Sequence, residues 1–323
     1  MDLWTLSDLA TPWCVHVAAT LRIADHIEAG KSEIADLAAS AGADRDSLHR
    51  LLRHLVRKGL FEEPSPGRFA LNDLARGLLG ESGHIGFDLN SIGGRMAHAW
   101  GTLLSAVRTG KTAYHERFGR GFWDDLDAHP AIAADFDALM GPVGHGTPDP
   151  NVLINREDWP SIKTIVDVGG GTGALLAGVL SVHPHVRGTL VDLPRTIARS
   201  GEIFQSAGVA DRVTTVGQSF FDPLPAGADL YLLKSVLADW PDREATSILK
   251  RCAEAARPSG RIVIFSGAGE GEEAAPELLM LILVGGRART VNDFRALCRE
   301  AGLQVTAVGR QISGRVLIEC WPL

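Results

Sequence analysis

The chain carries the sequence Asp167-Val168-Gly169-Gly170-Gly171-Thr172-Gly173 between an apolar segment, 164–168, and the helical pattern that follows it. Glycine permits a tight turn and lets a ligand approach the backbone closely, so a glycine-rich turn between a strand and a helix is typical of nucleotide-cofactor binding. Several kinds of nucleotide cofactor use such a turn, and the glycines alone do not distinguish them. The acidic residues around the turn narrow the choice of cofactor.

Two carboxylates accompany the glycines. Asp167 stands two residues before the first of them, where it would repel a pyrophosphate and attract a cationic amino or sulfonium group. Asp192 ends the next predicted strand, about twenty residues after the glycines, a place from which an acid holds ribose hydroxyls. Together these acids favour S-adenosylmethionine (SAM), or its product S-adenosylhomocysteine (SAH), over NAD. A purely structural turn is the alternative.

Short apolar segments alternate with helical patterns on the C-terminal side of residue 160. This alternation predicts an α/β fold with a parallel, doubly wound sheet. A turn near Ser313-Gly314 separates the last two extended segments and predicts an antiparallel hairpin, which an ordinary dinucleotide-binding domain lacks. The predicted strands are 164–168, 187–192, 213–217, 228–234, 261–266, 304–309 and 315–320.

Residues 1–95 show helical patterns and one hairpin pattern, which together predict a winged helix-turn-helix. The predicted helices are Leu9–Ala29, 32–38 and the residues from the N-cap Asp44 to Gly59, and the hairpin follows at 61–71. A winged helix often binds DNA, but residues 1–80 contain nine Lys and Arg against eleven Asp and Glu. Apolar residues such as Trp4 and Trp13 suit an arm that interlocks with a second copy of the chain. We therefore predict a homodimer without nucleic acid, and a ligand-sensing DNA regulator is the alternative.

The composition is that of a folded protein, with 323 residues, 45% of them hydrophobic and 22% charged, and a net charge of -7. No apolar run reaches the roughly 18 residues of a membrane span, and the N-terminus lacks the pattern of a secretory signal. The four cysteines form no C-x-x-C pair, which argues against zinc and a disulfide framework. We expect a reduced, cytoplasmic protein that binds neither metal nor membrane.

Large apolar residues gather between 96 and 140, ahead of a loop at 141–150 that is rich in Gly and Pro. Such a concentration is most often core, but between two domains it also suits the wall of an apolar ligand pocket. The predicted organisation is a dimerisation domain over 1–95, a helical linker and pocket wall over 96–150, and a cofactor domain over 151–323. The predicted pocket residues are Trp100, Phe118, Trp123, Phe136, Met140, His145 and Met280.

Several motifs follow one another in the order of a known family. Besides the glycine turn they are Leu6-Ser7-Asp8-Leu9, Ser219-Phe220-Phe221-Asp222-Pro223-Leu224-Pro225, Leu233-Lys234-Ser235-Val236-Leu237 and Gly285-Gly286-Arg287. Over essentially its whole length the chain resembles the bacterial branch of the small-molecule O-methyltransferase family, which includes caffeate-type and anthracycline-tailoring enzymes. The resemblance implies a Rossmann-like class I methyltransferase domain behind a winged-helix dimerisation domain. It also implies a SAM-dependent enzyme of natural-product and antibiotic biosynthesis with a small aromatic or polyketide-like substrate.

The resemblance also implies which residues hold the cofactor. Gly169 would lie under the methionine part, Asp192 would take the ribose, and Lys234 would lie at the cofactor's edge. Ser219 and Phe220 would flank the adenine, although the family often has Asp at the position of Ser219. The full predicted set is Asp167, Gly169, Gly171, Asp192, Leu193, Ser219, Phe220, Lys234 and Ser235.

The catalytic residues of base-dependent relatives are missing. Those relatives use a His followed by Asp-Trp and orient it with two Glu, whereas this chain has Ala238 at the His position and Ser266 and Ala288 at the Glu positions. General base catalysis contributes about 10²–10⁴-fold, and proximity can contribute roughly 7–11 kcal/mol. The leading prediction is therefore methyl transfer by proximity, without the His base.

Two residues are candidates for the missing base, His145 and Asp239. Each has a structural alternative, because His145 can be an ordinary loop residue and Asp239 can cap the next helix while Trp240 packs against it. The anthracycline-tailoring branch also includes a hydroxylating member that keeps SAM bound, and other relatives are pericyclases. A second hypothesis is therefore a repurposed scaffold that binds SAM and catalyses hydroxylation, cyclisation or a pericyclic rearrangement.

Overall fold

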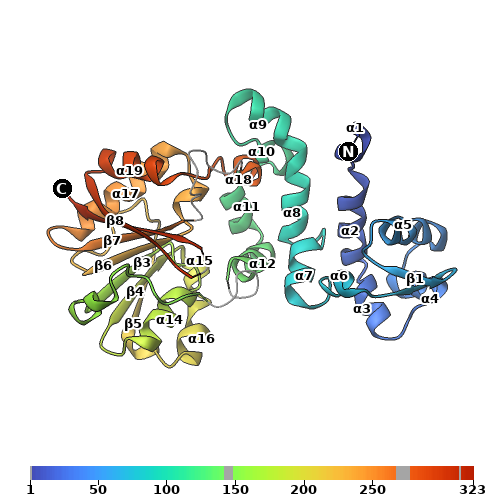
Figure 1. Ribbon diagram of the computed structural model, residues 1–323, viewed down its shortest axis with the longest axis horizontal. Helices are drawn as coiled ribbons and strands as arrows, with labels where there is room; N and C mark the ends of the chain where they lie inside the picture. The colour runs from blue at the N-terminus through green and yellow to red at the C-terminus, as the bar shows by residue number, and fades with distance from the viewer. Residues whose placement is uncertain (1, 142–147, 267–276, 313) are drawn as a thin grey trace. The chain divides into compact units, whose positions relative to one another are not determined.

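The computed structural model describes residues 2–141, 148–266, 277–312 and 314–323 (Figure 1). The chain forms two compact units, one made of Met1–His98 with His129–Leu139 and the other of Ala99–Ala128 with Met140–Leu323. The segment predicted as a linker, 96–150, contributes to both units. Within the described ranges, no helix combines the length and apolar character needed to cross a lipid bilayer.

The first unit has its own core, formed by helices and one small hairpin. Asp44 caps α5 as predicted, because its Oδ1 accepts a 2.9 Å hydrogen bond from the N–H of Ser47. The predicted wing is confirmed, since β1 and β2 pair antiparallel. The elements are α1 (Leu3–Leu6), α2 (Ala10–Thr20), α3 (Ile23–Glu28), α4 (Ile34–Ala41), α5 (Arg45–Arg57), β1 (Glu62–Ser65), β2 (Arg68–Ala70), α6 (Asp73–Arg76), α7 (Gly80–Phe87), α8 (Ile92–Ala99) and α12 (Pro130–Met140).

One helix of this unit differs from the prediction. The single helix predicted over Leu9–Ala29 is wrong, because the chain breaks between α2 and α3 at Arg22, whose φ of 55° is left-handed. The break changes the chain direction and lets both Ala18 at the end of α2 and Ile23 at the start of α3 reach 0% exposure. Burial on both sides of the break offsets the strain of a left-handed arginine.

The second unit contains a seven-stranded sheet of order β5-β4-β3-β6-β7-β9-β8. The strands are β3 (Thr164–Val168), β4 (Arg187–Asp192), β5 (Val213–Gly217), β6 (Leu230–Lys234), β7 (Arg261–Ser266), β8 (Leu303–Arg310) and β9 (Val316–Pro322). β3 to β7 run parallel, whereas β9 pairs antiparallel with both β7 and β8. The predicted parallel sheet with a C-terminal antiparallel hairpin is therefore confirmed.

Helices cover both faces of this sheet (Figure 1). On one face Tyr231 and Ile264 pack in the core that α17 (Asp242–Ala256) and α19 (Val291–Glu300) close. On the other face Leu232 and Val263 pack with α14 (Ala174–Val182) and α16 (Ser200–Ser206). Successive strand residues thus face opposite helical layers. The carboxyl ends of the five parallel strands remain together at one edge, where ligands bind in sheets of this kind.

Shorter helices complete the second unit. They are η1 (Trp100–Thr102), α9 (Leu103–Thr109), α10 (Tyr114–Phe118), α11 (Phe122–Ala128), η2 (Arg156–Ser161), α15 (Pro194–Ile197), η3 (Ala210–Arg212), η4 (Leu237–Asp239) and α18 (Leu278–Leu283). In the part of the chain that the structure describes, no group of three or more His, Cys, Asp or Glu side chains could hold a metal ion.

Candidate active site

The glycine turn joins β3 to α14 at the carboxyl edge of the sheet. Gly169, Gly171 and Gly173 all have positive φ angles, of 66°, 63° and 87°. A Cβ on Gly169 would lie 2.7 Å from Cγ2 of Val236, and a Cβ on Gly170 would lie 2.5 Å from Oδ2 of Asp167. The turn therefore needs glycine for its conformation and for its close contacts, and its backbone stays open to a ligand.

Asp167 is a buried carboxyl at the base of this turn. It is 1% exposed, and neither of its oxygens has a hydrogen-bond partner among the described residues. Burial raises its pKa to about 7, although the nearby charge of Lys234 acts in the opposite direction. An unsatisfied buried carboxyl is unfavourable until a cation or a hydrogen-bond donor reaches it. The residue therefore fits the cationic part of a ligand such as SAM.

Asp192 lies beside the turn at the end of β4. Its Oδ2 accepts a 2.8 Å hydrogen bond from the N–H of Gly171, and its Oδ1 accepts one of 2.7 Å from the N–H of Leu193. Burial raises the pKa of Asp192, and these two hydrogen bonds act against that rise. The side chain of Thr196 also hydrogen-bonds to it. The carboxylate is thus fixed in place, and because a carboxylate has about four lone-pair sites it can still accept a hydrogen bond from a ligand hydroxyl.

Residues at and just beyond the carboxyl ends of β5 and β6 lie near the same turn. The ring of Phe220 lies 3.3 Å from the place of a Cβ on Gly169. Lys234 ends β6, and burial lowers its pKa. The following residue, Ser235, has a φ of 60°, and its hydroxyl accepts a 3.0 Å hydrogen bond from Arg315. Ser219 instead uses its hydroxyl within its own loop, where it accepts a 3.2 Å bond from the N–H of Phe221.

The segment 237–242, named the reaction segment below, follows β6 and contains Ala238, the position at which the resemblance predicts the family's His. It is fixed by the buried side chain of Arg289, which donates hydrogen bonds to the carbonyls of Leu237 and Trp240 and to Oδ1 of Asp242. A Cβ on Gly286 would collide with the carbonyl oxygen of Ala238. The segment at 285–290 therefore packs directly on the reaction segment. Sequence reasoning missed Arg289, because no local sequence pattern distinguishes this buried arginine from an exposed one.

The three positions without an ionisable group lie on three elements. Ala238 belongs to η4, Ser266 ends β7, and Ala288 lies in the segment before α19. None of them can supply or orient a base.

Asp239 carries the nearest carboxyl in sequence. Its side chain has no hydrogen-bond partner among the described residues, and burial raises its pKa to about 7. The alternative that Asp239 caps the next helix is wrong, because α17 begins at Asp242 after Pro241 and has no side-chain cap. Pro241 disfavours a helical conformation of Trp240, which is extended, so the helix begins only after the proline. Trp240 does pack, stacked on Trp123 with ring centroids 6.2 Å apart.

The predicted pocket residues have different surroundings. The ring of Phe118 is tilted against that of Tyr114 with centroids 4.4 Å apart, and the carbonyl of Met280 accepts a 2.9 Å hydrogen bond from the N–H of Gly285. Trp100 and Met140 are exposed in the second unit. Phe136 belongs to the first unit, and His145 lies outside the described residues. The assignment of these residues to one pocket stays a prediction.

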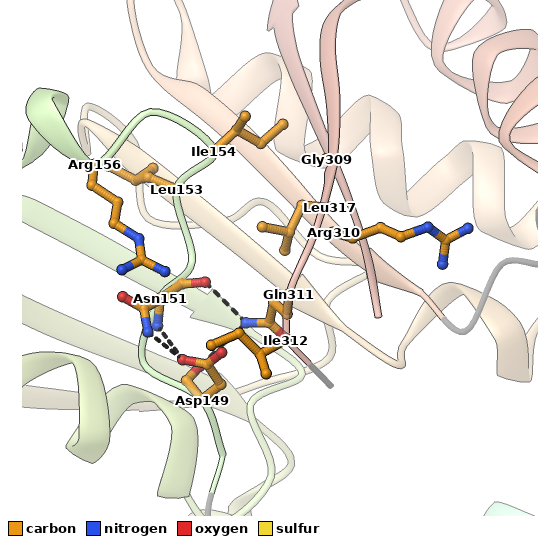
Figure 2. Close-up of a pocket in the computed structure, with 10 residues that line it drawn as sticks. All are labelled: Asp149, Asn151, Leu153, Ile154, Arg156, Gly309, Arg310, Gln311, Ile312 and Leu317. Atoms are coloured by element: carbon orange, nitrogen blue, oxygen red, sulfur yellow. Dashed lines mark hydrogen bonds between the residues drawn. The ribbon is translucent and has the colours of Figure 1, made fainter. Parts of the chain in front are cut away.

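A small hollow lies elsewhere on the second unit, at the ends of β8 and β9 (Figure 2). Its volume is about 100 Å³, below the roughly 300–1,000 Å³ of a typical ligand pocket. Gln311 closes one side by donating a 2.9 Å hydrogen bond to the carbonyl of Asn151. The lining residues are Asp149, Asn151, Leu153, Ile154, Arg156, Gly309, Arg310, Gln311, Ile312 and Leu317, all outside the glycine turn.

Comparison with known proteins identifies the family. Residues 100–304 match the O-methyltransferase domain, and residues 4–81 match the O-methyltransferase dimerisation domain. The chain belongs to the O-methyltransferase family. This confirms the family and the two-part architecture that the sequence motifs predicted.

Relatives of this O-methyltransferase family member come from natural-product biosynthesis. The 2,7-dihydroxy-5-methyl-1-naphthoate 7-O-methyltransferase of Streptomyces carzinostaticus is 41% identical over 95% of this chain and 93% of its own. Aclacinomycin 10-hydroxylase of Streptomyces purpurascens is 38% identical over 94% of this chain and 84% of its own. An O-methyltransferase from neocarzinostatin biosynthesis, crystallised with SAM and 2-hydroxy-5-methyl naphthoic acid, is 40% identical with a TM-score of 0.91, covering 100% and 99% of the two chains.

Proposed function

We propose that this O-methyltransferase family member binds SAM at the glycine turn and methylates a hydroxyl group of a small aromatic natural product without the family's His base. The observation that carries the proposal is the buried, unpartnered carboxyl of Asp167 beside the braced carboxylate of Asp192. Two acids at the carboxyl edge of the sheet suit a ligand with a cationic group and a ribose. Relatives crystallised with SAM and SAH support the same cofactor.

Each side chain at the edge has one task in this proposal. Asp167 faces the cationic part of the cofactor, Asp192 accepts the ribose hydroxyls, and Phe220 covers the turn. When bound, SAM supplies an electrophilic methyl group on a sulfonium centre. Trp240 and Trp123 provide flat apolar surface against which an aromatic substrate can be oriented.

Orientation has to replace general base catalysis here. A base supplies about 10²–10⁴-fold, whereas correct placement of two reactants supplies roughly 7–11 kcal/mol. A substrate hydroxyl that is already acidic, as on an electron-poor aromatic ring, needs little help to lose its proton. The naphthoate relatives support a hydroxylated aromatic carboxylic acid as the substrate class.

The hydroxylase relative favours a second candidate function, in which SAM is bound and not consumed. The test incubates the purified protein with SAM and a panel of hydroxynaphthoates and measures SAH and product mass together. The proposal expects one SAH for each product that gains a methyl group. Product that gains an oxygen atom while SAM stays intact would replace methyl transfer with the second function.

We also infer that the chain forms a homodimer through its first unit. Residues 4–81 match a dimerisation domain, and Trp4 and Leu9 are 85% and 76% exposed. Apolar side chains this exposed are typical of an interaction site when they gather in one segment. The DNA-regulator alternative predicts salt-sensitive DNA binding, which a titration at two salt concentrations tests.

A further inference from the structure

Arg289 is a buried cation whose contacts converge on one segment. Its side chain is 0% exposed. Nε and Nη2 donate hydrogen bonds of 3.0 and 2.8 Å to Oδ1 of Asp242, and Nη1 and Nη2 reach the carbonyls of Leu237 and Trp240. Burying a charge is costly unless it is paired and hydrogen-bonded. In the described part of the chain, all hydrogen bonds of the Arg289 guanidinium group go to residues of the reaction segment, 237–242.

The reaction segment has little regular structure of its own. It holds the three-residue helix η4 and then Trp240 in an extended conformation. The N–H of Asp239 donates to the carbonyl of Val236 at 3.2 Å, and the N–H of Trp240 donates to the carbonyl of Leu237 at 3.5 Å, a weak bond. The conformation of the segment therefore depends on the guanidinium group that binds its carbonyls.

The same segment is connected to the cofactor turn through aromatic rings. The ring of Trp240 lies edge-on to Phe221 and to Phe220, with centroid distances of 4.9 and 5.9 Å. Phe220 in turn lies against Gly169 of the turn. A shift of Trp240 would therefore move the wall that covers the turn. Because the proposed reaction lacks a base, its rate depends on such placement, and a misplacement of about 1 Å can reduce a rate about 100-fold.

We propose that Arg289 is a positioning residue for the function proposed above: its guanidinium group fixes the reaction segment so that Trp240 orients the substrate against the cofactor turn. Arg289 touches neither substrate nor cofactor in this proposal. It acts through the backbone carbonyls of Leu237 and Trp240. The proposal rests on the proposed function, but the clamp itself can be tested without turnover.

Arg287 offers a matched control in the same motif. Its Nη1 lies 3.3 Å from Oδ2 of the same Asp242, so it shares the anion with Arg289. Its side chain is 53% exposed, and it makes no described hydrogen bond to a carbonyl of the reaction segment. Exposed ion pairs contribute little. Arg287→Met therefore removes a cation from Asp242 without releasing the segment.

The first measurement is the near-ultraviolet circular dichroism of the Trp123–Trp240 pair in the protein without added cofactor. Trp240→Phe assigns the band of the pair. We expect Arg289→Met to lose at least half of this band, Arg289→Lys to give an intermediate loss, and Arg287→Met to keep the band of the wild type. A full band in folded Arg289→Met would overturn the clamp.

The second measurement is methyl transfer at saturating SAM with the substrate found above. We expect Arg289→Met to lower kcat at least tenfold with a smaller rise in the Kd for SAM, because Phe220 of the cofactor wall also contacts Trp240, and Arg287→Met to leave both within twofold. Equal kcat values in Arg289→Met and wild type would overturn the positioning role. If the wild type transfers no methyl group, the proposed function fails, and the dichroism comparison still decides the clamp.

A second variant keeps the test decisive if Arg289→Met does not fold. Asp242 is 53% exposed at the start of α17, so Asp242→Asn removes its charge at the surface and leaves its shape. We expect a partial loss of the band and a kcat about threefold lower. An unchanged band together with an unchanged kcat in this variant would count against the clamp.

Discussion

The N–H of Gly171 donates a 2.8 Å hydrogen bond to Oδ2 of Asp192, so the glycine turn is braced by the same carboxylate that we propose accepts the ribose hydroxyls. We expect Asp192→Ala to weaken SAM binding at least tenfold. A hydrogen bond to a charged group contributes about 1.5–3 kcal/mol, and the variant also releases the turn. Isothermal titration calorimetry measures this change.

Asp211→Ala serves as the control, because it also removes an acidic side chain from the same half of the sheet. Asp211 is exposed in η3. This variant should bind SAM as the wild type does. An unchanged Kd in Asp192→Ala would remove Asp192 from the cofactor site.

Gly169 and Gly171 have nearly equal φ angles but different surroundings. A Cβ at 171 meets nothing within 4 Å, whereas one at 169 lies 2.7 Å from Val236. Gly171→Ala should therefore lower the free energy of unfolding only by the strain of a left-handed residue, about 1–2 kcal/mol. Gly169→Ala should lower it by clearly more. Urea unfolding of the two variants measures the difference. Equal losses would mean that the contact with Val236 relaxes freely.

The buried carboxyl of Asp167 predicts a pH-dependent stability. Its pKa in the folded chain is about 7 against an ordinary 3.8, so the folded protein binds more protons than the unfolded one between these values. Stability is therefore fully present below pH 3.8 and is lost as the pH rises towards 7, by on the order of 4 kcal/mol. Asp167→Asn lacks this loss and should be the more stable protein above pH 7.

Urea unfolding of Asp167→Asn and wild type at pH 5 and pH 8 tests this sign. Asp239, whose pKa burial also raises to about 7, titrates in both proteins and cancels in the difference. Saturating SAM should stabilise the wild type more than the variant at pH 8, because a cation favours the ionised carboxylate. The same stability difference at both pH values would contradict the burial of an unpartnered Asp167.

Restoring the histidine alone should not restore base catalysis. Ala238→His would place an imidazole that neither Ser266 nor Ala288 can orient, at a packing cost of about 1–3 kcal/mol. The triple variant with Glu at 266 and 288 rebuilds an oriented base whose imidazolium form is stabilised. We expect at least tenfold faster SAH release from simple phenols with the triple variant than with Ala238→His. Equal rates would show that the three absences are not coupled.

The homodimer depends on exposed apolar residues at the start of the chain. The double variant Trp4→Ser/Leu9→Ser removes two side chains that are 85% and 76% exposed. Because apolar burial contributes about 25 cal/mol per Å², we expect dissociation at micromolar concentration, measured by light scattering. Leu323→Ser also changes an exposed leucine, and this variant should still have the mass of a dimer. A wild-type mass equal to one chain would reject the dimer.

The central strands could be predicted from the sequence because each is a short apolar run between polar or glycine-rich segments. β3 and β7 have the predicted bounds, Thr164–Val168 and Arg261–Ser266, since parallel strands are buried on both faces. The break at Arg22 could not be predicted, because neither Gly nor Pro marks it. Packing of α2 and α3 into one core determines that conformation.

Part of the candidate site could likewise be predicted from the sequence, and part could not. The glycines and the acids Asp167 and Asp192 could be found because their spacing along one strand–turn–strand unit is local. Arg289 could not, because its role depends on carbonyls about fifty residues earlier in the chain. From the sequence alone, a buried arginine and a solvated one look the same.

Because Gly286 lies so close to the carbonyl of Ala238, residues 237–242 and 285–290 have to be exchanged as a pair. A graft of residues 237–242 from a relative would change the path of the backbone, and Gly286 leaves no space for a carbonyl that has moved. The graft must therefore carry residues 285–290 with it, because the donor's own segment already fits. A redesign that changes the backbone path of residues 237–242 should therefore exchange residues 285–290 at the same time, whereas single side-chain substitutions in either segment leave the close contact in place.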